Sequence, residues 1–341
     1  TTRSQAIHLR PPSLHGAVRR CEDIVTSSRL ILFGSGGFAV PSFRAVASDP
    51  RFNIVAVVTA PPRAAGRSGA LSATPVDTWA SGGGLRVVHA AKVRDAAETE
   101  RIKSLGAEAA LLADFGQIIP KTLLDHYPRG IVNLHPSLLP RHRGASPIPA
   151  TILAGDRETG VSTIVMDEGV DTGPIIAVQH LRTRPAVTAA ELEVELAELA
   201  AVGVANTLAT WLQGSETAAP QGVDGATQTT RLGRADGRIG AGTTAELALR
   251  MWRAYQPWPG VWVEIPGVAD RLILSGVSAV EGGALVAPGV LELRDDTLLL
   301  GLAGGTIRLD RVTPAGGKSM TGGEFARGRQ GELAARGRIA E

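Results

Sequence analysis

Apolar positions along the first two thirds of the chain alternate between strand-like runs and helical spacing. The strand-like runs lie at 30–33, 53–59, 86–89, 109–115, 130–135, 162–166 and 175–181. Helical periods lie between them at 40–47, 97–105 and 148–154, and one long helix is expected over 189–213. Strands that alternate with helices are typical of a sheet covered on both faces. The pattern predicts an α/β fold, a doubly wound and mostly parallel sheet of the Rossmann-like kind.

The pattern changes after residue 213. Ser, Thr, Ala, Pro and Gly replace apolar periodicity over 214–225, as in a linker. A helix is expected over 244–255, and short strands separated by Gly and Pro turns are expected at 262–265, 272–274, 289–294, 297–302 and 306–312. Short, evenly spaced strands indicate a small OB-like β-barrel. We therefore expect one domain over 29–213 and a C-terminal β-barrel domain over 226–341.

Residues 1–28 show no sustained period, which predicts a flexible tail outside the fold. Arg3, Arg10, Arg19 and Arg20 come before the first acids, a composition that organellar transit peptides share. A cytoplasmic protein with a disordered leader is the simpler interpretation, and it is the one we favour.

Composition excludes several classes of protein. Hydrophobic residues make up 44% and charged residues 20%, which rules out a disordered, charge-rich chain. The longest apolar runs, such as 298–303, fall far short of the ~20 residues that cross a bilayer, so no membrane span is expected. Cys21 is the only cysteine, which excludes an internal disulfide and a Cys-rich zinc site. A formal charge of +2 does not by itself indicate a nucleic-acid-binding protein.

The turn after the first predicted strand is rich in glycine. Its sequence, Gly34-Ser35-Gly36-Gly37-Phe38-Ala39, matches the dinucleotide fingerprint G-x-G-x-x-A. That fingerprint also needs an acid at the end of the next strand to bind the ribose, and Val58-Thr59-Ala60-Pro61 has none. Arg63 could take a 2′-phosphate, so an NADP-linked reductase stays a remote alternative. Glycine-rich turns of this kind also occur in doubly wound folds that bind no dinucleotide.

Polar side chains end two of the predicted strands. Asn133 and His135 are two residues apart, so they point to the same side of a strand, roughly 6.6 Å apart. Asp171 lies in an acidic, glycine-containing loop over 166–174, directly after another strand. Each has an ordinary interpretation as well, since a single His is often structural and an acidic loop is often a solvated turn. One His among scattered carboxylates is no recognisable ligand set, so no metal is expected.

Together the three groups suit acyl transfer to an amine. Attack by an amine builds an alkoxide, which the amide of Asn133 and an N–H of His135 can stabilise. The attacking nitrogen must also lose a proton, and Asp171 can accept it directly or through a water. As an anion, Asp171 would also favour a protonated His135.

The residues around these groups resemble the folate-dependent formyltransferases. The likeness is strongest from Asn133-Leu134-His135-Pro136 to Ile148, continues at 156–160 and 166–174, and covers about residue 29 to the end. It implies that 29–213 is the catalytic domain, that N10-formyltetrahydrofolate donates the formyl group, and that Asn133, His135 and Asp171 are catalytic. It also implies folate contacts from two segments: Ser137, Leu138, Leu139 and Pro140, and Phe115, Gly116, Gln117 and Ile118.

The second domain restricts the resemblance to one group within this family. Segments 253–260 and 313–320 resemble the barrel of family members that formylate the α-amino group of methionyl initiator tRNA. The implied partners are therefore folate and this tRNA, the barrel is expected to bind the tRNA, and a monomer is expected. Candidate contacts with the tRNA or the folate tail are Arg67, Arg141, Arg143 and Lys318, although the lysines usual in the family after position 67 are absent from Ser68-Gly69-Ala70.

Several alternatives remain open from the sequence. A formyltransferase acting on an amino-sugar nucleotide or another small amine would keep the chemistry and change the acceptor. A catalytically inactive RNA-binding protein is a further alternative, which the presence of Asn133, His135 and Asp171 disfavours. Tyr255 and Trp258 could stack on RNA bases, but a cluster of aromatics and prolines more often packs into a core, and we expect that here.

Overall fold

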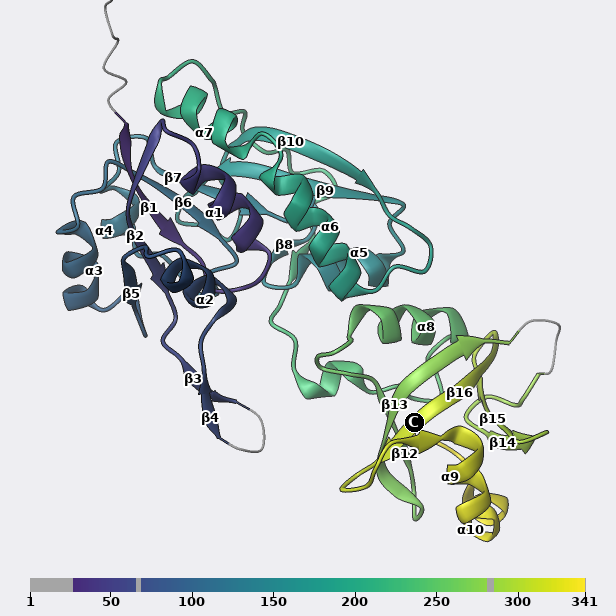
Figure 1. The fold of residues 1–341 in the computed structure, drawn as a ribbon. Coiled ribbons are helices and arrows are strands. Elements are labelled where there is room, and N and C mark those ends of the chain that lie inside the picture. Colours follow the sequence, from purple (N-terminus) through teal and green to yellow (C-terminus); the bar gives the residue numbers. More distant parts are fainter. Residues whose placement is uncertain (1–26, 66–68, 281–284, 341) are drawn as a thin grey trace, which may run out of the picture.

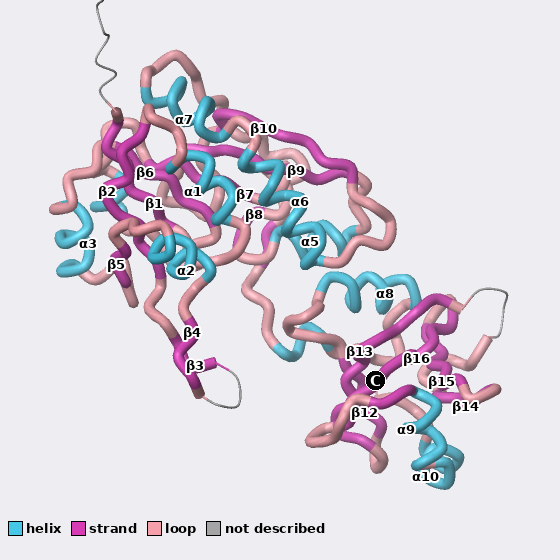
Figure 2. Tube along the Cα trace, viewed as in Figure 1, coloured by secondary structure: helices cyan, strands magenta, loops and turns pink. Residues whose placement is uncertain are grey.

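A computed structural model describes residues 27–65, 69–280 and 285–340 of the chain (Figure 1). Nearly all of the expected 1–28 tail, and Arg67, lie outside these residues. An N-terminal α/β domain is followed by a C-terminal domain built mainly of antiparallel strands (Figures 1 and 2). No helix in the described part of the chain has the length and apolar character that spanning a membrane requires.

A seven-stranded sheet in the order β10-β9-β7-β6-β1-β2-β5 forms the N-terminal domain. Its strands are β1 (Ser28–Phe33), β2 (Phe52–Thr59), β5 (Val87–His89), β6 (Ala109–Ala113), β7 (Ile131–His135), β9 (Glu158–Val165) and β10 (Ile175–Arg182). Strands β7, β6, β1, β2 and β5 are parallel, whereas β9 pairs antiparallel with both β7 and the edge strand β10, so β9 alone runs in the opposite direction. The predicted mostly parallel, doubly wound sheet is confirmed.

Helices cover both faces of this sheet, because successive strand residues point in opposite directions. Leu30 and Leu32 of β1 pack into one hydrophobic cluster, and Ile31 and Phe33 pack into the other. The first cluster lies beneath α1 (Ala39–Ala47), α2 (Pro75–Gly82), α5 (Pro147–Ala154), α6 (Ala189–Ala201) and α7 (Val204–Leu212). The second lies beneath α3 (Ala96–Lys103) and α4 (Lys121–Leu124).

Two local predictions were wrong. The single helix expected over 189–213 is two helices, because Val202 is extended and Gly203 adopts a left-handed φ of 80°. Both helices bury an apolar face in the same cluster, so the apolar period runs on across the break. The stretch over 60–74, where no strand was expected, contains a hairpin of β3 (Arg63–Ala65) and β4 (Ala70–Ser72), whose β4 residues are all exposed and carry no alternating pattern.

The C-terminal domain is a curled antiparallel half-barrel, which confirms the expected β-rich second domain. Its six strands are β12 (Trp262–Ile265), β13 (Ala269–Ala279), β14 (Leu291–Arg294), β15 (Thr297–Leu302), β16 (Gly305–Pro314) and β17 (Met320–Thr321). Register shifts between Leu274 and Val277 bend β13, as β-bulges do. Besides the expected helix α8 (Ala245–Ala254), the domain has α9 (Gly322–Gly328) and α10 (Gln330–Arg336), which the sequence pattern did not indicate.

The connection between the domains is hydrogen-bonded to the N-terminal domain. Ala219 forms an antiparallel bridge with Ile175, and β11 (Gln228–Thr229) pairs in parallel with β8 (Arg143–Gly144) of the N-terminal domain. We call residues 219–230 the strap. Although we expected the barrel domain to begin near residue 226, strap residues 226–230 lie against the N-terminal domain. The chain then enters the second domain through a short 3-10 helix, η1 (Arg234–Gly237).

Candidate active site

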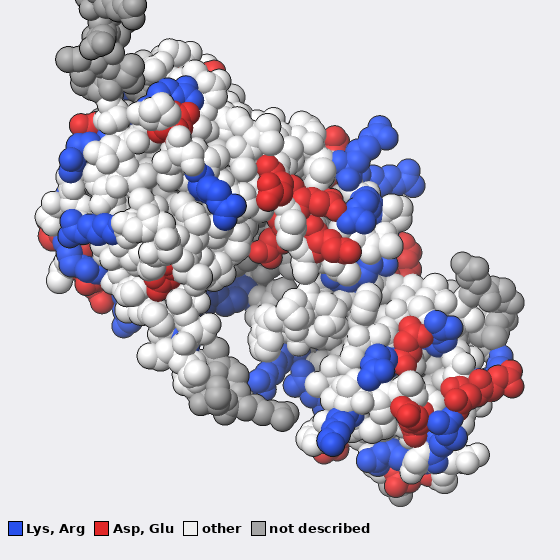
Figure 3. Space-filling model, in the orientation of Figure 1, with Lys and Arg blue, Asp and Glu red and all other residues white. Residues whose placement is uncertain are grey.

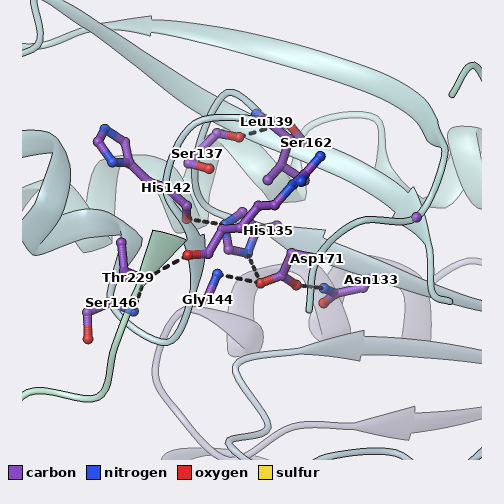
Figure 4. A network of polar contacts seen from close by, with 12 residues as sticks. Asn133, His135, Ser137, Leu139, His142, Gly144, Ser146, Ser162, Asp171 and Thr229 are labelled. Carbon is purple, nitrogen blue, oxygen red and sulfur yellow. Dashed lines mark hydrogen bonds and ion pairs between the residues drawn. The ribbon is translucent and has the colours of Figure 1, made fainter. Parts of the chain in front are cut away.

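Asn133 and His135 lie at the carboxyl end of β7, in the middle of the sheet. Both side chains are buried, and both point to the same side of the strand toward Asp171 (Figure 4). Ligands of open α/β sheets bind at the carboxyl ends of the parallel strands. The strand therefore presents an amide and an imidazole at the place where such a fold offers a site.

Asp171 reaches these side chains from the loop between β9 and β10. Its backbone is left-handed, with a φ of 53°. One carboxylate oxygen, Oδ1, accepts a hydrogen bond from Asn133 Nδ2 at 3.3 Å. The other, Oδ2, accepts one from the Gly144 N–H at 2.8 Å and lies 3.5 Å from His135 Nδ1 (Figure 4). The structure thus brings together the three residues that the sequence singled out.

The tautomer of His135 follows from its partners. Nε2 lies 2.9 Å from the carbonyl oxygen of His142, which can only accept, so Nε2 carries the proton. Nδ1 then faces Asp171. Burial is the largest influence on the pKa of His135 and lowers it, whereas the charge of Asp171 acts in the opposite direction. The protonated His135 that we expected is therefore not favoured at neutral pH, because desolvation outweighs the carboxylate.

A second imidazole–carboxylate pair holds the His142 carbonyl. His142 has a left-handed φ of 57°, its N–H donates to Thr227 Oγ1 at 2.8 Å, and its Nε2 lies 2.7 Å from Asp156 Oδ2. Arg141 Nη2 donates to the same carboxylate, at 2.7 Å from Oδ1. The Arg141 side chain, expected to contact tRNA or folate, is thus paired within the protein.

The turn over 137–140 is anchored to β9. Ser162 Oγ donates to the Ser137 carbonyl at 2.7 Å and accepts from the Leu139 N–H at 3.0 Å, while Ser137 Oγ donates to the Arg141 carbonyl at 2.7 Å. Ser137 and Leu139 are buried, whereas Leu138 and Pro140 are half-buried. Of the four residues expected to bind folate here, only Leu138 and Pro140 have side chains open to a ligand.

The segment over 115–118 is also only partly open. Phe115 is buried edge-on against Phe33, with ring centroids 5.6 Å apart. The Gln117 amide binds the loop beside it, donating to the Ala90 carbonyl and accepting from the Val93 N–H, each at 2.9 Å. Gly116 and Ile118 remain accessible, and Ile118 is 76% exposed.

Comparison with known proteins decides the family. The formyl transferase model matches residues 28–208, and the formyl transferase C-terminal domain model matches 231–330. A Rhizobium etli protein named methionyl-tRNA formyltransferase is 36% identical over 305 residues, which is 89% of this chain and 96% of that protein. A Gluconobacter oxydans protein of the same name is 38% identical over 301 residues, covering 88% and 96%. The chain belongs to the methionyl-tRNA formyltransferase family.

Solved structures show the same fold at lower identity. An N-formyltransferase from Helicobacter canadensis, in complex with folinic acid and dTDP-3-aminofucose, is 16% identical with a TM-score of 0.61 and covers 83% of this chain and 98% of that one. HypX from Aquifex aeolicus in complex with tetrahydrofolic acid is 18% identical with a TM-score of 0.56 and covers 90% of this chain and 47% of that one. At these identities the likeness is one of fold.

The remaining candidates for RNA contact in this formyltransferase are scattered. Arg143 is half-buried and donates to Gln221 Oε1 from Nε and Nη2, at 3.1 and 2.7 Å. Lys318 is exposed on the turn between β16 and β17, in the second domain. Arg67 lies outside the described residues. Within the described part of the chain, no group of three His, Cys, Asp or Glu could hold a metal ion.

The glycine-rich turn of this formyltransferase is occupied by its own chain. The N–H groups of Ser35 and Gly36 donate to the Asp114 carbonyl at 2.9 and 3.1 Å. The Asp114 carboxylate lies where a Cβ at position 36 would be, which explains the glycine there. A carboxylate in this position would repel a pyrophosphate. The NADP-linked reductase has no support from this turn or from the family.

Sequence reasoning missed the strap residues of the site. Gln221 Nε2 donates to the carbonyls of Asp171 and Gly173, both at 2.8 Å. Thr229 Oγ1 donates to the Arg143 carbonyl and accepts from the Ser146 N–H, both at 3.0 Å. The composition of this segment indicated a linker, and no apolar period marked these residues as part of a folded site.

Proposed function

We propose that the protein transfers the formyl group of N10-formyltetrahydrofolate to the α-amino group of methionyl initiator tRNA. The observation that carries the proposal is the Asp171 carboxylate between Asn133 and His135, in a chain similar over nearly its full length to methionyl-tRNA formyltransferases. The amino-sugar alternative rests on neighbours that are 16% identical in sequence, a likeness of fold alone.

The reaction moves one proton. A bond forms between the amino nitrogen and the formyl carbon, the bond from that carbon to N10 breaks, and a proton passes from the attacking to the leaving nitrogen. Asp171 and the unprotonated Nδ1 of His135 are the groups that can accept this proton and return it. A neutral His135 that becomes charged only during the transfer suits a pKa lowered by burial.

We assign Asn133 the role of stabilising the alkoxide that forms when the amine attacks the formyl group. Its Nδ2 carries two N–H groups, and one of them donates to Asp171 Oδ1. The second is left for the oxygen that becomes negative when the amine attacks, and a single donor of this kind contributes about 3 kcal/mol to the transition state. Asp171 therefore orients Asn133 as well as taking part in the proton transfer.

The folate is assigned to the turn over 137–140 and the segment over 115–118, which follow the neighbouring parallel strands β7 and β6. Leu138, Pro140 and Ile118 offer apolar surface, which suits a flat ring system, and Gly116 leaves room for close approach. Ser137, Leu139 and Phe115, which are buried, and the half-buried Gln117, whose amide is bonded to the neighbouring loop, shape the walls without touching the ligand through their side chains.

The tRNA is assigned to the recess between the two domains, where Lys and Arg side chains are visible (Figure 3). Arg231 follows the strap, just before the second domain. Its Nη2 donates to the Gly116 carbonyl at 3.3 Å, which places a guanidinium beside the segment over 115–118. Arg234 lies over the ring of Trp258, with Cζ 5.9 Å from the ring centroid. Tyr255 is buried as expected, but Trp258 is 53% exposed, so our expectation of a buried Trp258 was wrong.

Unpaired bases stack on aromatic rings and on guanidinium planes. Arg231, Arg234 and Trp258 therefore form a path for the single-stranded 3′ end that carries the methionyl group. They also offer positive charge and stacking surface in a chain that lacks the lysines usual after position 67.

Replacing Trp258 with alanine should raise the KM for methionyl-tRNA about tenfold, since a stacked base contributes ~1–3 kcal/mol, and should leave kcat nearly unchanged. Arg234→Ala should lower the slope of log affinity against log salt by about one. Arg294→Ala, on β14 at the opposite edge of the sheet, is the matched control and should change neither value. A steady-state titration of tRNA at several salt concentrations measures both, and a KM unchanged in Trp258→Ala would remove this residue from the path.

The proposed reaction is tested by product analysis. Purified protein is supplied with N10-formyltetrahydrofolate and, in separate reactions, methionyl initiator tRNA, free methionine or an amino-sugar nucleotide. The proposal expects formylmethionine after the ester of the tRNA product is hydrolysed, and little formylation of the two small amines. Formylation of the sugar nucleotide alone would overturn the acceptor and keep the chemistry.

A further inference from the structure

The connection between the domains forms one wall of the catalytic site. The Arg143 N–H donates to the Thr227 carbonyl at 3.0 Å, and the Thr227 N–H donates to the Pro140 carbonyl at 3.3 Å. Thr227 Oγ1 accepts from the His142 N–H, and Thr229 Oγ1 bonds to the Arg143 carbonyl within β8 and to the Ser146 N–H that follows it. The strap therefore holds the stretch over 140–146, whose His142 carbonyl fixes the imidazole of His135.

Gln221 is the strap residue that reaches the catalytic carboxylate loop. Both N–H groups of its amide are used, one for the Asp171 carbonyl and one for the Gly173 carbonyl. Its oxygen accepts two N–H groups of Arg143. The half-buried amide uses both of its N–H groups, each at 2.8 Å. A side chain without N–H donors at this position would leave the Asp171 and Gly173 carbonyls without these hydrogen bonds, which costs free energy.

These contacts close a ring around Asp171. Gly144 donates to the carboxylate at 2.8 Å, Arg143 precedes Gly144 in β8, Arg143 donates to Gln221, and Gln221 donates to the Asp171 backbone. The left-handed backbone at Asp171 is uncommon for a residue with a side chain, so the surrounding contacts must hold it. The ring does this from the backbone side and from the carboxylate side.

We propose that Gln221 is a positioning residue for Asp171, through which the link to the second domain sets the geometry of formyl transfer. This inference rests on the proposed function. Gln221 does not touch the reacting atoms, and it acts by holding the carboxylate in place between Asn133 and His135. The strap continues directly into Arg231 and Arg234. A tRNA bound to those two residues therefore contacts the same stretch of chain that holds the Asp171 loop.

The test compares Gln221→Ala and Gln221→Met with the wild type and with Gln213→Ala. Gln213 is an exposed glutamine at the end of α7, outside the strap. Single-turnover formyl transfer should slow by about 10- to 100-fold in both Gln221 variants, since a displacement near 1 Å has effects of this size. The KM for the folate should stay within about twofold, and Gln213→Ala should match the wild type.

Two readouts separate positioning from a general loss of structure. First, the acid limb of the rate profile should move to lower pH in Gln221→Ala, because His135 loses part of the nearby negative charge that raises its pKa. Second, Gln221→Ala should add little to the defect of Asp171→Asn, because residues that act through one another are not additive.

Three outcomes are decisive. Rates equal to the wild type in both Gln221 variants would overturn the inference and leave the proposed function intact. A slower rate with an unmoved acid limb and a fully additive double variant would also overturn it, because Gln221 would then serve stability alone. Failure of the wild-type protein to formylate methionyl-tRNA would instead overturn the proposed function.

Discussion

Replacing His135 with alanine should lower the single-turnover rate of formyl transfer by about 10³-fold, within the range of 10²–10⁴ that general acid–base groups contribute. The imidazole is 4% exposed, its Nε2 proton is committed to the His142 carbonyl, and its Nδ1 faces Asp171. Alanine removes the atom that can hold the transferred proton. Folate affinity should change little, because this role belongs to the transition state.

Quenched-flow formylation of methionyl-tRNA measures the rate, and quenching of protein fluorescence by the folate measures affinity. His180→Ala is the matched control, since His180 is exposed on β10 and paired with Glu158. It should behave as the wild type. An equal loss of folate affinity and of rate in His135→Ala would show that His135 binds substrate instead of moving a proton.

Replacing Asp171 with asparagine should lower the same rate by about 10²–10³-fold. Asparagine cannot take a proton from the amine, and it offers no negative charge to the Asn133 amide or the Gly144 N–H. Asp125→Asn, on an exposed carboxylate after α4 that pairs with Lys121, is the control and should leave the rate unchanged. A rate near that of the wild type in Asp171→Asn would show that the proton leaves by another route.

The pH dependence of the transfer rate shows in which direction the charge of Asp171 moves the pKa of His135. Burial lowers the pKa of His135 from its ordinary 6.5, so His135 is neutral at pH 7 and becomes protonated only as the pH falls below that value. The transfer rate should therefore still hold at the pH where an ordinary imidazole becomes protonated, and its acid limb should lie below that pH. Asp171→Asn removes the charge that opposes this lowering, so its acid limb should lie at still lower pH. A rate that rises with acidity would show that a protonated His135 is needed.

The sequence located the catalytic side chains because a strand has a simple period. Apolar neighbours alternate along β7, so Asn133 and His135 had to share a side, and the end of a parallel strand is where such folds bind ligands. Asp171 could be added because its acidic loop directly follows a predicted strand, but the antiparallel pairing of that strand with β7, which places Val165 beside Val132, was not predicted. The distances between the three groups, and the tautomer of His135, depend on partners that no period reveals.

The strap could not be predicted because its contacts are long-range. Arg143 and Gln221 are 78 positions apart, and their hydrogen bonds leave no hydrophobic pattern in either segment. The same limit applies to the internal hydrogen bonds of the Arg141 and Gln117 side chains, which no sequence period indicates. For Trp258 the sequence predicted too much burial. A cluster of aromatics and prolines favoured a buried ring, but the turn after α8 leaves the ring half-exposed beside Arg234.

The central claim is that the cluster of Asn133, His135 and Asp171 passes a formyl group to methionyl initiator tRNA. A single-turnover competition tests it most directly: N10-formyltetrahydrofolate with a labelled formyl group is mixed with protein and equal amounts of methionyl initiator tRNA and an amino-sugar nucleotide. The account predicts that the label enters the tRNA product, and that His135→Ala abolishes most of this transfer while still binding the folate. Label in the sugar nucleotide, or transfer to tRNA that His135→Ala leaves unchanged, would contradict it.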